Sequence, residues 1–347
     1  MIMRILLVGT GEFYHVGAFY NKGLQALGIE HAFLDDWKYK QRLNRSIVHR
    51  LVYRVLGGGP LGSRGFNRQL LQLARDCRPD VLLAVKGDPI FPETLAQIKR
   101  QTGAVLVNYA TDDPFNPVVR TRDLVDAIPI YDLYVCTKRA IMDDVRRAGC
   151  REVTYLPFAY EPALHFPEAP ATTEEAERFR SDVVFIGGAD RDRVPYFEAL
   201  LDGVPGLRLH LYGGYWKRYP RLRHCYRGFA LGRDYRLALA CTKVAPCLVR
   251  RSNRDGHVMR SFEVPACRTF MLAERTEEHL DLFEDGKEAG YFGTPEELVE
   301  KTRSYLSDDG EGRARMAEAA FQKVRRGKHT YQDRLQSILD IASQLYV

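Results

Sequence analysis

The sequence lacks any apolar run that approaches the roughly 20 residues needed to span a bilayer. Its amino terminus, Met-Ile-Met-Arg-Ile-Leu-Leu-Val-Gly, passes directly into a strand pattern and lacks the basic segment and cleavage site of a secretory signal. From these two absences we expect a cytoplasmic protein.

Disulfide and metal-binding patterns are also missing. The seven cysteines are odd in number and form no Cys-x-x-C pair, which excludes a disulfide framework and a zinc site of the usual spacing. We therefore predict buried thiols and no metal site.

Charge is modest overall but unevenly spread. The chain has 347 residues, a length that is enough for two domains. Its formal net charge is +6, yet residues 37–78 hold ten Lys or Arg and only one acid, Asp76. Such an excess attracts an acidic substrate, anionic lipid head groups or nucleic acid. Residues Ile47–Leu56 predict an amphipathic helix, either packed on the domain or docked peripherally on the inner membrane surface. We exclude nucleic acid, because the aromatic residues of Trp216–Arg236 lack a regular spacing for base stacking.

The first half alternates strand and helix patterns. Expected strands are 4–9, 31–34, 80–85, 104–108, 134–136 and 152–156, with helices to about Leu27 and over 92–100 and 139–148. This alternation predicts an α/β fold with a doubly wound, mainly parallel sheet and ligands at the carboxyl ends of its strands. We expect domains at 1–160 and 181–328, a linker at 161–180 and a final helical segment at 329–347.

Three groups of polar residues follow expected strands of the first half: Gly11 to His15, Lys86-Gly-Asp88 and Thr111-Asp-Asp113. Their acids and histidine are candidates for acid–base work or for orienting hydroxyls, and equally for turns and caps. Gly9-Thr-Gly11 also begins a dinucleotide-binding pattern. Tyr14 occupies its third glycine position, which argues against NAD.

A second glycine turn follows the expected strand Asp182–Ile186. Gly187 and Gly188 stand where a phosphate can bind, with Arg191 and Arg193 close by in sequence. The other interpretation is a turn followed by surface arginines.

The stretch from Asp255 to Glu274 gives the most specific prediction. Pro265 favours the first turn of a helix, so we expect a helix that begins at Ser261 as N-cap. Arg260 and Ser261 then lie at its positive end, suited to a phosphate, and Glu263 can accept hydrogen bonds from a ribose diol. Together they indicate a nucleotide. The alternative is a buried helix with a capping serine and a solvated arginine.

The segment from Arg251 to Cys267, Arg-Ser-Asn-Arg-Asp-Gly-His-Val-Met-Arg-Ser-Phe-Glu-Val-Pro-Ala-Cys, resembles the signature of CgeB-like glycosyltransferases, related to the retaining GT-B enzymes with a Glu-x7-Glu motif. The likeness continues through 283–288, 294–298 and 329–334, and more loosely over the whole chain. It implies two Rossmann-like domains facing a central cleft, with the acceptor side first, the donor side second and the last helix crossing back. It also implies that Glu263 binds the donor's ribose, while Asp255 stands at the sugar-contacting position.

The resemblance implies an enzyme of the EC 2.4 class that moves a sugar from a nucleoside diphosphate, UDP or GDP, to an unidentified acceptor: a glycan, protein, lipid or small molecule. We expect no cofactor and no metal, because Arg260 and a helix N-terminus can hold the diphosphate. The expected catalytic residues are His15, Asp112 and Arg260, and the expected donor-binding residues are Gly11, Gly187, Gly188, Arg193, Asp255, His257, Arg260, Ser261 and Glu263. The alternatives are a non-catalytic nucleotide-sugar or polysaccharide-binding protein of the same fold, and an NAD(P)-dependent oxidoreductase.

One residue departs from the family pattern. Arg268 follows Pro-Ala-Cys, where the family has glycine in a left-handed helix cap. We expect a different turn or some strain there, and one more cation near the donor site.

Overall fold

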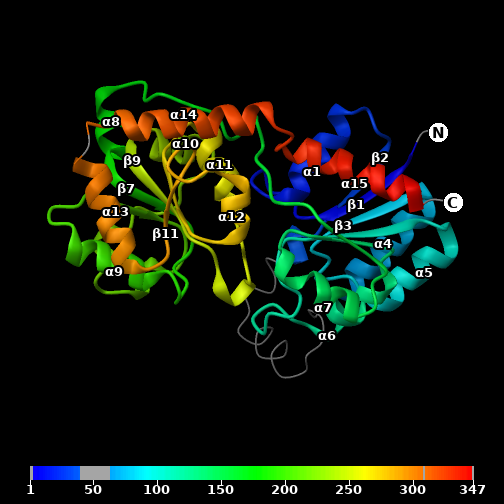
Figure 1. The fold of residues 1–347 in the computed structure, drawn as a ribbon. Helices are drawn as coiled ribbons and strands as arrows, with labels where there is room; N and C mark the ends of the chain where they lie inside the picture. The colour runs from blue at the N-terminus through cyan, green and yellow to red at the C-terminus, as the bar shows by residue number, and fades with distance from the viewer. Residues whose placement is uncertain (1–2, 40–62, 308, 346–347) are drawn as a thin grey trace. The chain divides into compact units, whose positions relative to one another are not determined.

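The computed structural model describes residues 3–39, 63–307 and 309–345. The chain forms two compact units (Figure 1). Unit 1 comprises the described residues of Met1–Pro157, Ser252–Arg254 and Tyr331–Val347, and unit 2 comprises those of Phe158–Arg251 and Asp255–Thr330. The helix expected at Ile47–Leu56 lies outside the described residues, as do five of the ten basic residues of 37–78.

Unit 1 is built on a parallel sheet of six strands in the order β2-β1-β3-β4-β5-β6. The strands are β1 (Ile5–Gly9), β2 (His31–Asp35), β3 (Val81–Val85), β4 (Val105–Ala110), β5 (Leu133–Cys136) and β6 (Glu152–Tyr155). Its helices are α1 (Val16–Ala26), α4 (Ser63–Cys77), α5 (Pro92–Thr102), α6 (Arg122–Asp126), α7 (Met142–Arg147) and α15 (Tyr331–Leu345).

The central strands of unit 1 are buried along their whole length, because helices cover both faces of the sheet. Leu6 and Leu82 share one face with side chains from α4 and α5. On α1, Phe19 meets Tyr331 of α15, with ring centroids 4.8 Å apart. The last helix of the chain therefore packs beside α1, although the two are far apart in sequence (Figure 1).

Unit 2 holds a parallel sheet of five strands in the order β11-β10-β9-β7-β8. The strands are β7 (Ser181–Ile186), β8 (Leu209–Tyr212), β9 (Thr242–Cys247), β10 (Met271–Glu274) and β11 (Gly290–Phe292). The helices are α8 (Thr173–Phe179), α9 (Val194–Gly203), α10 (Arg233–Ala240), α11 (Arg260–Ala266), α12 (Glu277–Leu282), α13 (Pro295–Ser307) and α14 (Glu311–Arg326).

Alternate residues of β7 enter two separate cores. Val183 and Phe185 pack with Phe197 of α9 and Trp216 on one face, whereas Val184 packs with Phe262 of α11 on the other. The sheet of unit 2 is thus covered on both sides, and sheets of this kind bind ligands at the ends of their strands.

The predicted α/β class with doubly wound parallel sheets is confirmed. The missed elements include the helices α4 and α10 and the strand β9, whose sequence Thr-Lys-Val-Ala-Pro-Cys contains a proline. Pairing between β9 and β7 ends at Val244, so the missing N–H of Pro246 breaks no hydrogen bond to β7.

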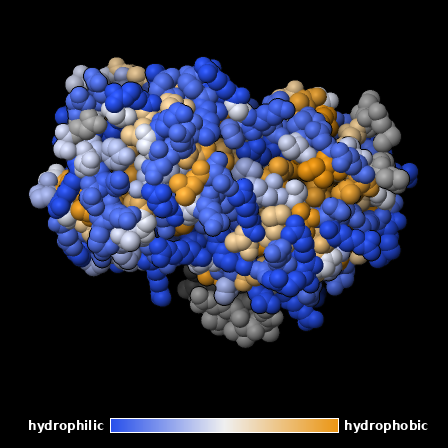
Figure 2. Space-filling model, viewed as in Figure 1, coloured by the Kyte–Doolittle hydropathy of each residue, from blue (hydrophilic) through white to orange (hydrophobic). Residues whose placement is uncertain are grey.

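The surface is largely polar. Figure 2 shows mainly hydrophilic residues on the visible face of each unit, with hydrophobic residues gathered in smaller areas between them. Among the described helices, none combines the length and the hydropathy that crossing a bilayer requires.

Candidate functional site

Each sheet has a point where the chain reverses its direction of winding. In unit 2, β8 lies on one side of β7 and β9 on the other, so the loops after β7 and β9 separate at the carboxyl edge. In unit 1 the same reversal lies between β1 and β3. Open α/β sheets bind ligands at such points.

The turn after β7 is shaped by two close backbone approaches. Gly213 has φ of +120°, and a Cβ there would lie 2.4 Å from the carbonyl oxygen of Gly187. The same oxygen accepts a hydrogen bond of 2.8 Å from Nε1 of Trp216. Only glycine fits at 213, and the turn Gly187-Gly188 is held against the end of β8.

Three arginines crowd beside this glycine turn. Arg193 is buried, and its guanidinium donates to the Leu248 carbonyl oxygen at 3.0 Å and lies 3.2 Å from Oδ2 of Asp190. Burial first, and then the nearby charge of Arg260, lower the pKa of Arg193 to about 10; Arg250 adds to the repulsion and Asp190 opposes it. Buried cations without enough counter-charge mark a site for an anion.

Two donors of this cluster have no partner within the described part of the chain. They are the Nε atoms of Arg193 and Arg260, both buried. Leaving buried charged donors unsatisfied is costly, and an anion bound between these side chains would satisfy them. The cluster formed by Arg193, Arg250 and Arg260 is named the arginine cluster below.

The helix α11 differs from the expectation. It begins at Arg260, Met259 already has helical dihedrals, and Pro265 lies in its last turn rather than its first. Ser261 is therefore inside the helix and is not the N-cap. Its Oγ nevertheless accepts a hydrogen bond of 3.1 Å from the N–H of Val258, so the hydroxyl still satisfies a backbone donor at the helix start.

Two buried histidines fix the start of α11. Nε2 of His257 accepts from the backbone N–H of Phe158 at 2.9 Å, so its Nδ1 carries the proton and donates to Glu278 at 2.6 Å. His279 lies 2.7 Å from the Glu274 carbonyl oxygen through Nδ1 and 2.8 Å from the Ser261 hydroxyl through Nε2. A carbonyl only accepts, so Nε2 of His279 accepts from Ser261. Both ring nitrogens of His257 are thus engaged within unit 2, and neither is left to contact a nucleotide-sugar donor. We therefore correct its expected role from donor binding to positioning the start of α11.

Glu263 faces two side chains that sequence reasoning missed. Its Oε2 accepts a hydrogen bond of 2.8 Å from the hydroxyl of Tyr235, and its Oε1 lies 3.7 Å from Nε2 of His165. The N–H of Glu161 donates to Nδ1 of His165, so Nε2 bears the proton of the neutral ring. No spacing in the sequence pointed to either partner, since both lie more than 25 residues before Glu263.

Asp255 stands near the arginine cluster. Its carboxylate is buried and raises the pKa of Arg193 by its charge, against the dominant effect of burial. The structure therefore brings Gly187, Arg193, Asp255 and Arg260 to one edge of unit 2, with Glu263 one turn further along α11.

Arg268 has a left-handed backbone conformation, which glycine adopts most readily. Its φ is +59°, so the expected strain is present at this turn. Its Nε lies 2.5 Å from Oε2 of Glu318 on α14. Arg268 follows the carboxyl end of α11 and pairs with α14, so its guanidinium is already engaged by an acid.

In unit 1, a carboxylate accepts hydrogen bonds from the backbone at the glycine loop that follows β1. Oδ1 of Asp35 accepts from the backbone N–H groups of Gly11 at 2.8 Å and Trp37 at 2.9 Å. In a dinucleotide site, the loop's N–H groups would face a pyrophosphate instead. The close helix–strand contact is made by Gly17, where a Cβ would lie 2.6 Å from the Thr10 carbonyl oxygen, and not at Tyr14. The Gly11 N–H is thus already satisfied by Asp35.

His15 and Asp112 lie in unit 1, after β1 and β4. His15 is the N-cap residue of α1, without a capping hydrogen bond from its side chain, and its ring lies 4.7 Å from that of Tyr14. Asp112 is paired: Nζ of Lys86 lies 3.0 Å from its Oδ2 and 3.0 Å from Oδ2 of Asp88. Burial lowers the pKa of Lys86, but the two carboxylates outweigh it and raise that pKa overall.

Asp113 is a structural residue. Its carboxylate takes a two-point contact from Arg254, with Nε at 2.6 Å and a terminal nitrogen at 3.0 Å. Arg254 also reaches Asp144, and this hydrogen bond is the main cause that lowers the pKa of Asp144. Residues Ser252–Arg254 are thereby tied into unit 1.

Asp190 and Asp192 form an Asp-x-Asp pair in the second half of the sequence. Two such carboxylates can bind a metal ion, and the expectation of a metal-independent enzyme overlooked them. Asp190 is directed at cations, with Oδ2 3.2 Å from Arg193 and 3.4 Å from Arg250. Among the described residues, His, Cys, Asp and Glu side chains form no group of three that could hold a metal ion.

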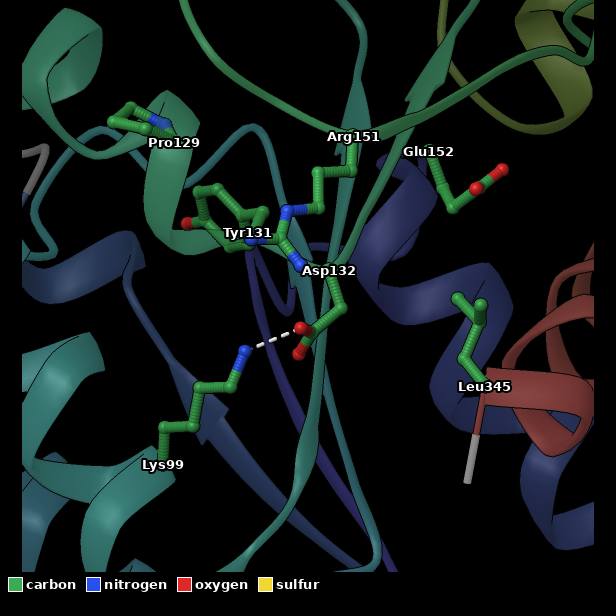
Figure 3. A pocket seen from close by; sticks show the side chains of 7 residues that line it. All are labelled: Lys99, Pro129, Tyr131, Asp132, Arg151, Glu152 and Leu345. Carbon is green, nitrogen blue, oxygen red and sulfur yellow. Dashed lines mark hydrogen bonds and ion pairs between the residues drawn. The ribbon is translucent and has the colours of Figure 1, made fainter. Parts of the chain in front are cut away.

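A cavity of about 390 Å³ lies at the opposite, amino edge of the unit 1 sheet. Figure 3 shows Lys99 and Asp132 pointing toward one another inside it, joined as an ion pair. The residues that line it are Lys99, Pro129, Tyr131, Asp132, Arg151, Glu152 and Leu345. None of the predicted site residues is among them.

Comparisons with known proteins bear on the fold and the family of the chain. Residues 192–340, which include the arginine cluster and α11, match a family model described as glycosyl transferase-like. A search of curated protein sequences found no match.

Solved structures match over nearly the whole chain. Sucrose-phosphate synthase from Thermosynechococcus elongatus has a TM-score of 0.71 at 11% identity, covering 99% of both chains. HepE of Anabaena, solved in complex with UDP and glucose, has a TM-score of 0.67 at 14% identity, covering 99% of this chain and 100% of that one. A UDP-forming α,α-trehalose-phosphate synthase from Burkholderia vietnamiensis has a TM-score of 0.64 at 12% identity, covering 99% and 100%. The chain has the GT-B fold of these structures, and its residues 192–340 are similar to a glycosyl transferase-like family.

Proposed function

We propose that this protein transfers a sugar from a nucleoside diphosphate, bound in unit 2, to an acceptor hydroxyl. The observation that carries the proposal is the arginine cluster, with two buried Nε donors left unpartnered beside the Gly187-Gly188 turn. The glycosyl transferase-like match over 192–340 supports it, as do the UDP complexes of the structurally similar HepE. The resemblance to CgeB-like enzymes is part of the same proposal.

The arginines supply the chemistry of the leaving group. The acceptor oxygen forms a bond to the anomeric carbon while the bond from that carbon to the diphosphate breaks, and its electron pair goes to the diphosphate. Arg193 and Arg260 would stabilise this growing negative charge in a water-poor site, where such charges interact strongly. We propose that they do so without a metal ion, because Asp190 is directed at Arg193 and Arg250.

Glu263 would bind the ribose. Tyr235 occupies one lone pair of Oε2, which leaves acceptor capacity on both oxygens for the two hydroxyls of a diol. The hydrogen bond from Tyr235 fixes the carboxylate in place before the donor binds.

Unit 1 would bind the acceptor at the carboxyl edge of its sheet. The acceptor loses its proton in the reaction, and His15 or Asp112 would take it or orient the hydroxyl. Asp112 can act as a base only if its ion pair with Lys86 opens or shifts.

The paired state of Asp112 also favours a second candidate: a nucleotide-sugar-binding protein of the same fold without turnover. The two functions share the donor site and differ in the release of free nucleoside diphosphate. A protein that binds a donor but releases none with any acceptor or with water would support the second.

The test is a thermal-shift screen of the purified protein against UDP, GDP, ADP, CMP and dTDP and their common sugars, with NAD(H) and NADP(H) as controls. A ligand that binds only the folded state raises Tm. We expect one nucleoside diphosphate family to raise Tm, and the shift to shrink in Glu263→Gln. A shift only with nicotinamide nucleotides, or with none of the nucleotides, would contradict the proposal.

A further inference from the structure

A basic and aromatic loop lies at the edge of unit 2. Its ends pair with β8: the N–H of Gly213 donates to the Gly228 carbonyl oxygen at 2.8 Å, and that of Arg227 to the Leu211 carbonyl oxygen at 2.9 Å. Residues 213–231 are named the β8 loop below. β8 is the last strand of its sheet, so the loop extends from an edge.

The β8 loop is firmly built. Trp216, Leu222 and Cys225 are buried, and Trp216 is anchored through Nε1 to the Gly187 carbonyl oxygen. Short helical turns at Trp216–Arg218 and Arg223–Cys225 shape the chain between them. Its outward-facing residues are therefore presented on a fixed scaffold.

Large apolar side chains point outward from this loop. Tyr215 is 61% exposed, Phe229 is 66% exposed and Leu231 is 44% exposed. The Gly213–Gly228 hydrogen bond brings the chain before Tyr215 beside the chain before Phe229. Exposed large apolar residues that gather in one place mark an interaction surface.

Cations without acidic partners surround these side chains. Lys217, Arg218, Arg223 and Arg227 are exposed, and none makes an ion pair within the described ranges. The guanidinium of Arg218 lies over the Tyr215 ring at 4.4 Å, and Nζ of Lys217 over the Tyr226 ring at 5.5 Å. By contrast, the neighbouring Arg221 is neutralised by Asp202.

We propose that the β8 loop docks unit 2 on an anionic membrane surface. Exposed aromatic and aliphatic side chains suit the boundary between head groups and acyl chains, while unpaired cations attract acidic lipids. The exposed side chains of Phe229 and Leu231 argue against two alternatives. A loop that is merely solvated would not require them, and they would add no binding energy at a site for a soluble polyanion. The inference concerns a different part of the chain from residues 37–78 and does not depend on sugar transfer.

The test is co-sedimentation of the full chain with vesicles of phosphatidylcholine alone or mixed with phosphatidylglycerol. We expect binding to the mixed vesicles only, weakened by salt. The variant Lys217→Gln/Arg218→Gln/Arg223→Gln should lower the partition coefficient by about fivefold for each cation removed. The variant Phe229→Ser/Leu231→Ser should lower it further at high salt, where only apolar insertion remains.

The matched control is Lys301→Gln/Arg325→Gln/Arg326→Gln, which removes the same charge from exposed positions of α13 and α14 in the same unit. It should bind vesicles as the unmodified chain does, and all variants should keep its Tm. Equal loss in the control, binding that survives the loop variants, or binding to soluble polyphosphate but not to vesicles would overturn the proposal.

Discussion

Arg268 has a strained, left-handed backbone conformation at the turn after α11. A non-glycine residue in the left-handed region is destabilised by about 1–2 kcal/mol, and the exposed pair with Glu318 recovers little of that. A glycine at this position would avoid the strain.

We predict that Arg268→Gly is more stable than Arg268→Ala by about 1 kcal/mol. Both variants lose the Glu318 pair, so their difference reports the backbone alone. Urea unfolding monitored by circular dichroism measures it. Equal stability of the two variants would show that residue 268 is not left-handed in solution.

His279 is a buried neutral histidine that holds Ser261 at the start of α11. Burial lowers its pKa to about 4, the nearby His257 adds to this, and the hydrogen bond to the Glu274 carbonyl oxygen opposes it. The unfolded chain takes up a proton near pH 6.5, whereas the folded chain resists it. Its effect on stability is therefore greatest above pH 6.5, falls as the pH drops, and levels off below about 4.

We predict that the free energy of unfolding falls between pH 7 and pH 5 and that His279→Gln flattens this slope by about one proton. Urea unfolding at several pH values gives the slopes. His224→Gln, a change at an exposed ring, is the control and should leave the slope as it is. An unchanged slope in His279→Gln would mean that the ring is not buried in the neutral form.

At the scale of elements, close packing of α1 on β1 depends on a glycine. A Cβ at Gly17 would lie within 3 Å of the backbone of Gly9 and Thr10. At Gly65 of α4, no atom of the described residues lies within 4 Å of such a Cβ. The same substitution should thus have opposite effects in two helices of one unit.

We predict that Gly17→Ala lowers stability by about 1–3 kcal/mol through overpacking, while Gly65→Ala raises it by about 0.5–1 kcal/mol through helix propensity. Thermal unfolding of both variants checks this. Stabilisation by Gly17→Ala would contradict the packing of α1 on β1.

The sequence predicts most of these elements because apolar periodicity and turn residues coincide. β9 escaped prediction because Pro246 and a polar start hide a short central strand, and the sheet tolerates the proline only where β7 has already diverged. The start of α11 was misplaced for a similar reason: Pro265 stands in the last turn of a seven-residue helix.

The candidate site was predictable where it lies within one short stretch, as with Arg260 and Glu263. Partners that only the fold brings together could not be predicted. Tyr235 and His165 contact Glu263, and Lys86 pairs with Asp112. These residues are distant in sequence, so no local pattern indicates that they meet. The role of Asp35 in closing the Gly11 loop belongs to the same class.

At the scale of the whole molecule, each of the two parallel sheets has a point where the winding reverses. The charged residues at these two points differ. The edge in unit 1 has its charges paired, with Lys86 between two acids and Asp35 on the glycine loop. The edge in unit 2 concentrates arginines in excess of acids. This difference is the reason why we propose that the anionic donor binds to unit 2.

The most direct test is calorimetric titration of the nucleoside diphosphate that raises Tm into the unmodified chain, Arg193→Met, Arg260→Met and the control Arg326→Met. Each of the first two removes a charge-assisted contact of about 1.5–3 kcal/mol, so Kd should rise roughly 10- to 150-fold, while the control binds normally. Unchanged affinity in Arg193→Met and Arg260→Met, with both variants folded, would contradict the assignment of the donor site to the arginine cluster.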